Sequence, residues 1–285
     1  EFSLGLSIYS IWKRSNKDLA DKTSLYAIKF LTQLYDFDQA YSLLSEIEDS
    51  NEKLLYELNI LQHQGKDALA ATKIQQLLDD PMLEKDKFFY IILRNSAHLC
   101  SYKEAEYNLK ECIKFFNTHG TLFERATIYN NISVIQIWNG IETYSEAKNN
   151  LKKSINIHQS IQSNEIFEPY CNLSVLLFME GKYTDALRYA NLALEELPHR
   201  LEMDVIILNI NKMIIEVALG KTDLNTLYQE LKNYCTKPVA FKDPWIMFQI
   251  SYNLYNIEKA MDGFSTTEYS DYYIDKCHMY TGFEV

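Results

Sequence analysis

The sequence contains one near-match to a nucleotide-binding motif, but the motif is incomplete. Gly220-Lys221-Thr222 ends like a phosphate-binding loop, which cradles phosphates between a strand and a helix. Ile215 occupies the position where that loop needs its first glycine, and a helix rather than a strand is expected before it. Neither a GxSxG nucleophile elbow nor an HExxH zinc helix occurs in the sequence. We therefore expect this segment to end a helix, and we predict no catalytic residues in this chain.

Histidines and cysteines do not lie at the spacings of a metal site. His98 and Cys100 are two residues apart and Cys277 and His278 are adjacent, but neither pair has a second pair nearby in the sequence. The five cysteines are odd in number and form no CxxC motif, which favours a reducing, cytoplasmic setting. We predict no metal and no cofactor, and we expect any catalytic activity to belong to a domain outside this chain.

The most informative polar residues are asparagines that precede a glycine by nine positions. The pattern occurs three times, at Asn131/Gly140, Asn172/Gly181 and Asn211/Gly220. Aligned on the glycines, the asparagines take the same place on three successive helices, so stacking would align them in a column. A side-chain amide offers both a donor and an acceptor, and a column of amides can bracket the backbone of an extended peptide.

Apolar residues lie in register beside this column, and together they would form a trough suited to a peptide or an amphipathic helix. The candidate ligand-binding residues are Asn131, Asn172, Asn211, Asn130, Val134, Trp138, Val175, Phe178 and Ile214. Two alternatives stay open at this point. The apolar residues could be core between repeats, and the asparagines could bond the neighbouring helix and fix the repeat geometry.

Composition favours long helices and argues against two classes of partner. Hydrophobic residues make up 47% of the chain, but it has only eight Gly and five Pro, too few for the frequent turns of a β-rich fold. The net charge of −11 disfavours contact with nucleic acid, whose phosphates need clustered Lys and Arg. The sequence has no apolar stretch of eighteen residues, so we expect no membrane partner.

A pattern of aromatic, small and turn residues repeats along the chain. Its clearest copy consists of Tyr170, Asn172-Leu173-Ser174, Gly181, Tyr183, Ala186, Ala190, Ala193-Leu194 and Pro198. Weaker copies are anchored by Ala40, Ala70, Ala105, Ala147 and Ala186, which lie 30, 35, 42 and 39 residues apart. The pattern resembles the tetratricopeptide repeat (TPR), a helix–turn–helix unit of 34 residues, in the extended form seen in bacterial regulatory and sensor proteins.

The resemblance implies an all-α fold, a right-handed α-solenoid of about six TPR-like hairpins with capping helices. We expect the helix pairs at 24–35 with 38–48, 53–64 with 67–78, 86–99 with 103–117, 122–138 with 144–162, 166–180 with 183–196, and 201–219 with 223–235. Residues 1–285 would form a single domain, with an N-terminal cap at 1–23, repeats over 24–235, and a C-terminal helix and Tyr-rich cap at 243–285. Asp243 would cap that last helix and Pro244 would be its first residue. Because the sequence begins with Glu1-Phe2, it could be a piece of a longer protein.

The resemblance also implies a function. TPR proteins commonly hold a protein or a short peptide on the concave face of their first helices, which here carries the asparagines. The leading interpretation is a non-catalytic sensor or scaffold module of a bacterial-type intracellular regulatory protein. Two alternatives remain: a purely structural solenoid that forms homo-oligomers, and the peptide-pheromone receptor domain of a transcriptional regulator.

Overall fold

The computed structural model describes residues 17–48, 50–97, 100–197, 202–237 and 244–262. In these residues every regular element is a helix, which confirms the predicted all-α solenoid class. The contacts divide the chain into two compact units, one that ends at Asp79 and one that begins at Asp80. Among the described residues no helix is long and apolar enough to cross a membrane.

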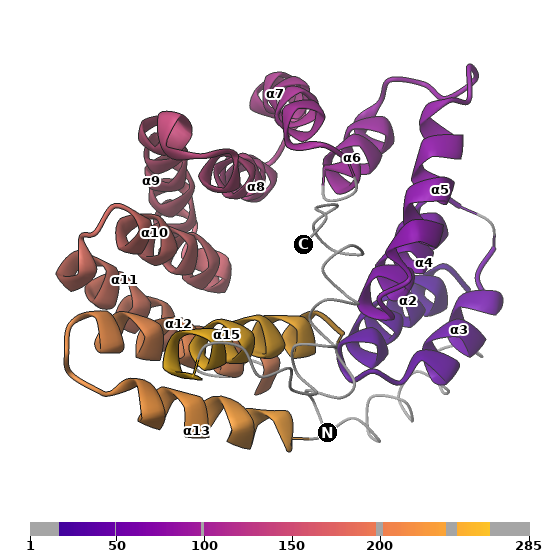
Figure 1. The fold of residues 1–285 in the computed structure, drawn as a ribbon. Helices are drawn as coiled ribbons and strands as arrows, with labels where there is room; N and C mark the ends of the chain where they lie inside the picture. Colours follow the sequence, from indigo (N-terminus) through magenta and orange to yellow (C-terminus); the bar gives the residue numbers. More distant parts are fainter. Residues whose placement is uncertain (1–16, 49, 98–99, 198–201, 238–243, 263–285) are drawn as a thin grey trace. The chain divides into compact units, whose positions relative to one another are not determined.

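The described residues of the first unit form four helices arranged as two hairpins (Figure 1). They are α2 (Lys17–Gln33), α3 (Phe37–Ser45), α4 (Asn51–His63) and α5 (Asp67–Leu78). Ile28 and Leu31 of α2 pack with Ala40 and Leu44 of α3 and with Ile60 of α4, and all five are buried. The first helix begins at Lys17 rather than at the expected residue 24, so residues 17–23 are helical. The rest of the expected N-terminal cap, residues 1–16, lies outside the described residues.

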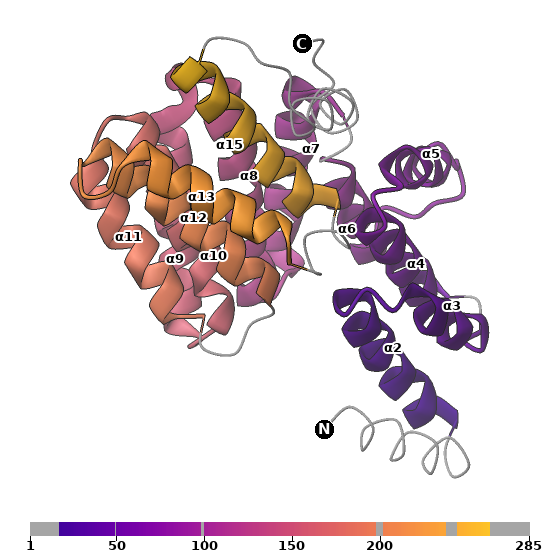
Figure 2. The same cartoon turned by 60° about the horizontal axis from the view of Figure 1, so that its bottom comes forward.

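The second unit continues the alternation of first and second helices (Figures 1 and 2). Its helices are α6 (Lys87–Ser96), α7 (Tyr102–His119), α8 (Leu122–Asn139), α9 (Tyr144–Ser160), α10 (Phe167–Met179), α11 (Tyr183–Glu195), α12 (Glu202–Ala218), α13 (Leu224–Cys235) and α15 (Pro244–Asp262), and short 3-10 turns η1 (Ile141–Thr143) and η2 (Asn164–Ile166) precede α9 and α10. The last helix begins at Pro244, as predicted. Asp243 and the Tyr-rich segment after residue 262 lie outside the described residues.

Several first helices end at a residue with a positive backbone φ, and this conformation explains why glycine marks the repeats. At Gly181 and Gly220 the backbone φ is +74° and +67°. The backbone N–H of the next residue donates a hydrogen bond to the carbonyl five residues back, from Lys182 to Leu177 and from Lys221 to Glu216. Glycine suits this helix end because a side chain in the left-handed region costs about 1–2 kcal/mol. The Gly220 segment therefore ends a helix, as expected.

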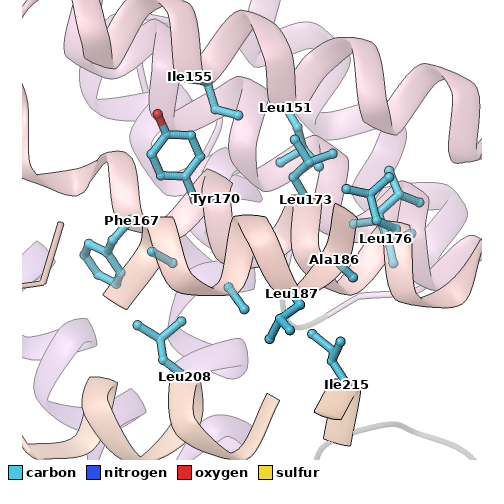
Figure 3. Close-up of a cluster of buried hydrophobic side chains, with 14 of the residues drawn as sticks. Leu151, Ile155, Phe167, Tyr170, Leu173, Leu176, Ala186, Leu187, Leu208 and Ile215 are labelled. Carbon is cyan, nitrogen blue, oxygen red and sulfur yellow. The ribbon is translucent and has the colours of Figure 1, made fainter. Parts of the chain in front are cut away.

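The core of the second unit lies between the helices of successive hairpins. Leu151 of α9, Leu173 and Leu176 of α10 and Ala186 of α11 are almost fully buried in one cluster (Figure 3). The small side chain of Ala186 lets α10 and α11 approach closely, and Ser174 Oγ donates to the Ala186 carbonyl at 2.8 Å. Burial of a leucine contributes about 1.5–3 kcal/mol, so this cluster holds the hairpins together and presents their first helices in register.

Candidate functional site

The three aligned asparagines lie on α8, α10 and α12, and two of them bond the preceding first helix. Asn172 Nδ2 donates to Asn130 Oδ1 at 2.9 Å, and Asn211 Nδ2 donates to Cys171 Sγ at 3.5 Å. In each case the acceptor is the residue just before the asparagine of the preceding repeat. The two bonds therefore link α8 to α10 and α10 to α12 by the same geometric relation.

Asn130 takes part in this linkage with both polar groups of its amide. It is only 4% exposed, its oxygen accepts from Asn172, and its Nδ2 donates to Glu168 Oε2 at 3.3 Å. A buried amide that loses such partners is costly, typically about 1–3 kcal/mol. This placement favours a structural role for Asn130, between two helices rather than towards a ligand.

Asn131 differs from its two counterparts. It is partly buried, and its side chain makes no hydrogen bond within the part of the chain that the structure describes. Val134 and Trp138 follow it at intervals of three and seven residues, so all three lie on one face of α8. Trp138 is 55% exposed, whereas Val134 is partly buried. This face of α8 therefore offers an unused amide next to accessible apolar surface.

The other predicted apolar residues are engaged in packing to different degrees. The ring centroids of Phe178 and Tyr183 lie 5.3 Å apart, and Phe178 packs on the core of the α10–α11 hairpin. Ile214 packs on the cluster that joins α12, α13 and α15. Val175 is partly buried on α10, which packs directly on α8. The structure thus brings Asn131, Val134, Trp138 and Val175 onto adjoining helices, while Phe178 and Ile214 contribute mainly to packing.

Two exposed apolar residues on or beside the first helices were missed by the sequence analysis. Met179 of α10 is 41% exposed and Ile141, in the turn after α8, is 79% exposed. The hydroxyl of Tyr144, at the start of α9, lies 3.6 Å from Met179 Sδ. The spacing could have revealed Met179, because it precedes Gly181 by two residues just as Trp138 precedes Gly140.

Ion pairs and burial set the protonation states of two residues on α10, Glu180 at its end and Cys171 within it. Glu180 accepts from Lys148 and from Lys182, the latter at 3.0 Å. Burial alone would raise the pKa of Glu180, but these bonds outweigh it and the pKa lies below its usual value. Burial raises the pKa of Cys171 to about 11, so its sulfur is a neutral thiol that accepts from Asn211. Within the described residues no cluster of His, Cys, Asp or Glu could hold a metal ion.

Comparison with known proteins identifies the fold but no family. No protein-family model matches the chain, and no curated protein sequence does. The fold is similar to that of a Rap protein solved in complex with Competence and Sporulation Factor, with a TM-score of 0.64 and 15% sequence identity over 95% of this chain and 78% of that chain. BtubC from P. vanneervenii also matches, with a TM-score of 0.49 and 16% identity over 87% of this chain and 94% of that chain. The chain is therefore a helical-repeat protein whose fold is shared with a Rap protein.

Proposed function

We propose that this chain is a non-catalytic module that binds a protein or a short peptide on the first helices of its second unit. In this proposal it belongs to the extended TPR proteins and acts as the sensor or scaffold of a bacterial-type cytoplasmic regulatory protein. The whole chain would be one repeat domain whose end segments serve as caps. The observation that carries the proposal is the face of α8 that presents Asn131 and Trp138, because its amide is unused and its indole is accessible.

Two further observations support a peptide as the ligand. An extended peptide exposes unpaired backbone groups, and one amide side chain can satisfy both an N–H and a carbonyl. The Rap protein with the same fold was solved in complex with Competence and Sporulation Factor. In this proposal Asn131 bonds the ligand backbone and Val134, Trp138 and Val175 contact its apolar side chains. Asn172 and Asn211 would contribute the amide groups that the links between helices leave unused.

The proposal is tested by selecting linear peptides from a displayed random library against the full chain. The affinity of a selected peptide is then measured by calorimetry for the wild-type chain, Asn131→Ala and Trp138→Ala. One lost hydrogen bond lowers affinity by about two- to tenfold, corresponding to roughly 0.5–1.5 kcal/mol, and loss of the indole lowers it further. Asn149→Ala is the matched control, because Asn149 is exposed on second helix α9. Selected peptides that bind all four proteins equally would refute the proposed face.

Self-association is the second candidate, and one feature of the first unit favours it. Tyr26 and Phe30 of α2 and Leu34, the residue just after it, follow one another at four-residue spacing, and they are 74%, 41% and 39% exposed. Large apolar side chains on one helical face are typical of a contact between protein chains. Light scattering of the chain with and without residues 264–285 tests this alternative and the role of the Tyr-rich tail. A monomer in both cases would eliminate a structural, oligomerising role.

A further inference from the structure

A buried histidine lies at the joint between the α8–α9 hairpin and the next first helix, α10. His158 is in the last turn of α9 and is 2% exposed. Its ring packs edge-on against the ring of Phe123 at the start of α8, with the centroids 5.9 Å apart. Among the described residues its Nδ1 has no hydrogen-bond partner. Because an imidazolium carries an N–H on both nitrogens, protonation in this position would bury a charged donor without an acceptor.

The turn after α9 ties this histidine to the segment that leads into α10. The backbone N–H of Ser163 donates to the carbonyl of His158 at 3.0 Å, and Ser163 Oγ accepts from the backbone N–H of Glu165 at 3.2 Å. Gln162, between them in the chain, has a left-handed φ of +51°. Glu165 belongs to η2, which runs directly into α10. A displacement of the His158 ring towards Glu165 therefore acts on the start of α10.

The start of α10 also holds one end of the bonds that link α8 to α10. Glu168 lies in the first turn of α10, three residues after Glu165, and its Oε2 accepts from Asn130 Nδ2 at 3.3 Å. Asn130 Oδ1 in turn accepts from Asn172 Nδ2 at 2.9 Å. A continuous series of bonds therefore connects the joint at the end of α9 with the amide groups of the first helices, which is the kind of contact chain that can couple two sites.

Glu165 is the charged group that acts on the imidazole. Burial lowers the pKa of His158, and the negative charge of Glu165 opposes this only in part. The end of α9 packs against α8, η2 and α10. The other titratable side chains there are Lys152 and Lys153 of α9, Glu124, Arg125 and Tyr129 of α8, and Glu168 and Tyr170 of α10. Since the pKa of His158 responds to Glu165 among these groups, Glu165 is the carboxylate with which an imidazolium at this joint pairs.

We propose that His158 is an acid-sensitive switch, which changes the spacing between α8 and α10 when its imidazole takes up a proton. The imidazolium turns from its place beside Phe123 to the carboxylate of Glu165, because a charge-assisted hydrogen bond replaces the missing acceptor. The segment η2 moves with Glu165, and the side-chain bonds between α8 and α10 weaken. The consequence for binding rests on the proposed function: the first helices then hold their ligand less tightly at acid pH.

The test follows histidine rings and asparagine side-chain amides of the full chain by NMR between pH 7.5 and pH 5. The ring of His158 is expected to titrate below the ordinary histidine pKa of about 6.5, and the amide signals of Asn130 and Asn172 are expected to shift with the same midpoint. Circular dichroism verifies that the chain stays folded over this range. Amide signals that stay constant while the His158 ring titrates, or a ring that takes up no proton before the chain unfolds, would overturn the switch.

Three variants assign the response to this joint. His158→Gln takes up no proton, so the amide shifts should disappear. Glu165→Gln removes the opposing charge and the charged acceptor, so the ring should titrate at lower pH and the amide shifts should shrink. His119→Gln is the matched control, because His119 is exposed at the end of α7, and it should leave the amide shifts unchanged. The same amide shifts in His158→Gln as in wild type would refute the role of His158, and the wild-type titration decides alone if that variant does not fold.

Calorimetry with one selected peptide separates the switch from the proposed function. Between pH 7.5 and pH 5.5 the affinity of wild type should fall about fivefold or more relative to that of His158→Gln. Peptide binding with equal pH dependence in both proteins, together with constant amide signals, overturns the switch and leaves the proposed function standing. If the amide signals shift as expected but no peptide binds at either pH, the switch stands and the proposed function fails.

Discussion

Replacing Asn172 with alanine removes one amide from the column, and the structure predicts a cost in stability. The substitution deletes the 2.9 Å bond to Asn130, whose oxygen then stays buried without a donor because Asn130 is only 4% exposed. An unsatisfied buried acceptor costs about 1–3 kcal/mol. For a unit of this size each kcal/mol lowers the melting temperature by about 2–4 °C, so a decrease of roughly 2–12 °C is expected.

Asn131→Ala is the internal control for this experiment. It makes the same chemical change at the equivalent position, and the gain in helix propensity is the same. Asn131 has no hydrogen bond to lose, so its stability should change by no more than about 0.5 kcal/mol. Thermal and urea unfolding monitored by circular dichroism measure both variants.

A double-mutant cycle then tests the reasoning. Asn130→Ala and Asn172→Ala should be coupled by about 1 kcal/mol, because the double variant removes donor and acceptor together. Equal stability of Asn172→Ala and Asn131→Ala, or additive effects of the two changes in the cycle, would refute the inter-helix role of Asn172.

Three further predictions concern stability and domain structure. His158 is buried, its Nδ1 has no hydrogen-bond partner in the described residues, and burial lowers its pKa against a smaller opposing effect of Glu165. As the pH falls, the unfolded chain therefore takes up a proton before the folded chain does, and wild type loses stability. Between pH 7 and pH 5.5 the free energy of unfolding should fall less in His158→Gln than in wild type, whereas above the ordinary histidine pKa of about 6.5 its pH dependence should be the same in both. Gln162 is exposed with φ of +51°, so Gln162→Gly should stabilise the fold by about 0.5–1 kcal/mol in urea unfolding; destabilisation would show that the left-handed strain is absent. Lys85 is exposed in the segment between α5 and α6, where the two compact units join, so limited trypsin digestion should cut there early, and a bond that outlasts those within α8 would contradict the division.

Much of the fold could be predicted from local signals. Glycine residues at the ends of first helices and alanine residues inside the hairpins placed most helix bounds within a few residues, because both have direct steric causes at a helix end or a close helix contact. The early start of α2 was missed because residues of N-cap type occur at Asp18, Asp21 and Thr23, so they do not single out one start. The positions of Asn131, Asn172 and Asn211 were also predictable from their spacing to glycine.

The partners of these residues were not predictable, because they depend on the axial offset between neighbouring helices. An offset of one residue decides that Asn172 meets Asn130 rather than Asn131.

A crystal structure of the chain with one selected peptide tests the central claim most directly. The account predicts an extended peptide on the first helices, with its backbone bonded to Asn131 and its apolar side chains against Val134 and Trp138. A peptide bound on the second helices α9 and α11, or on α2 of the first unit, would contradict it.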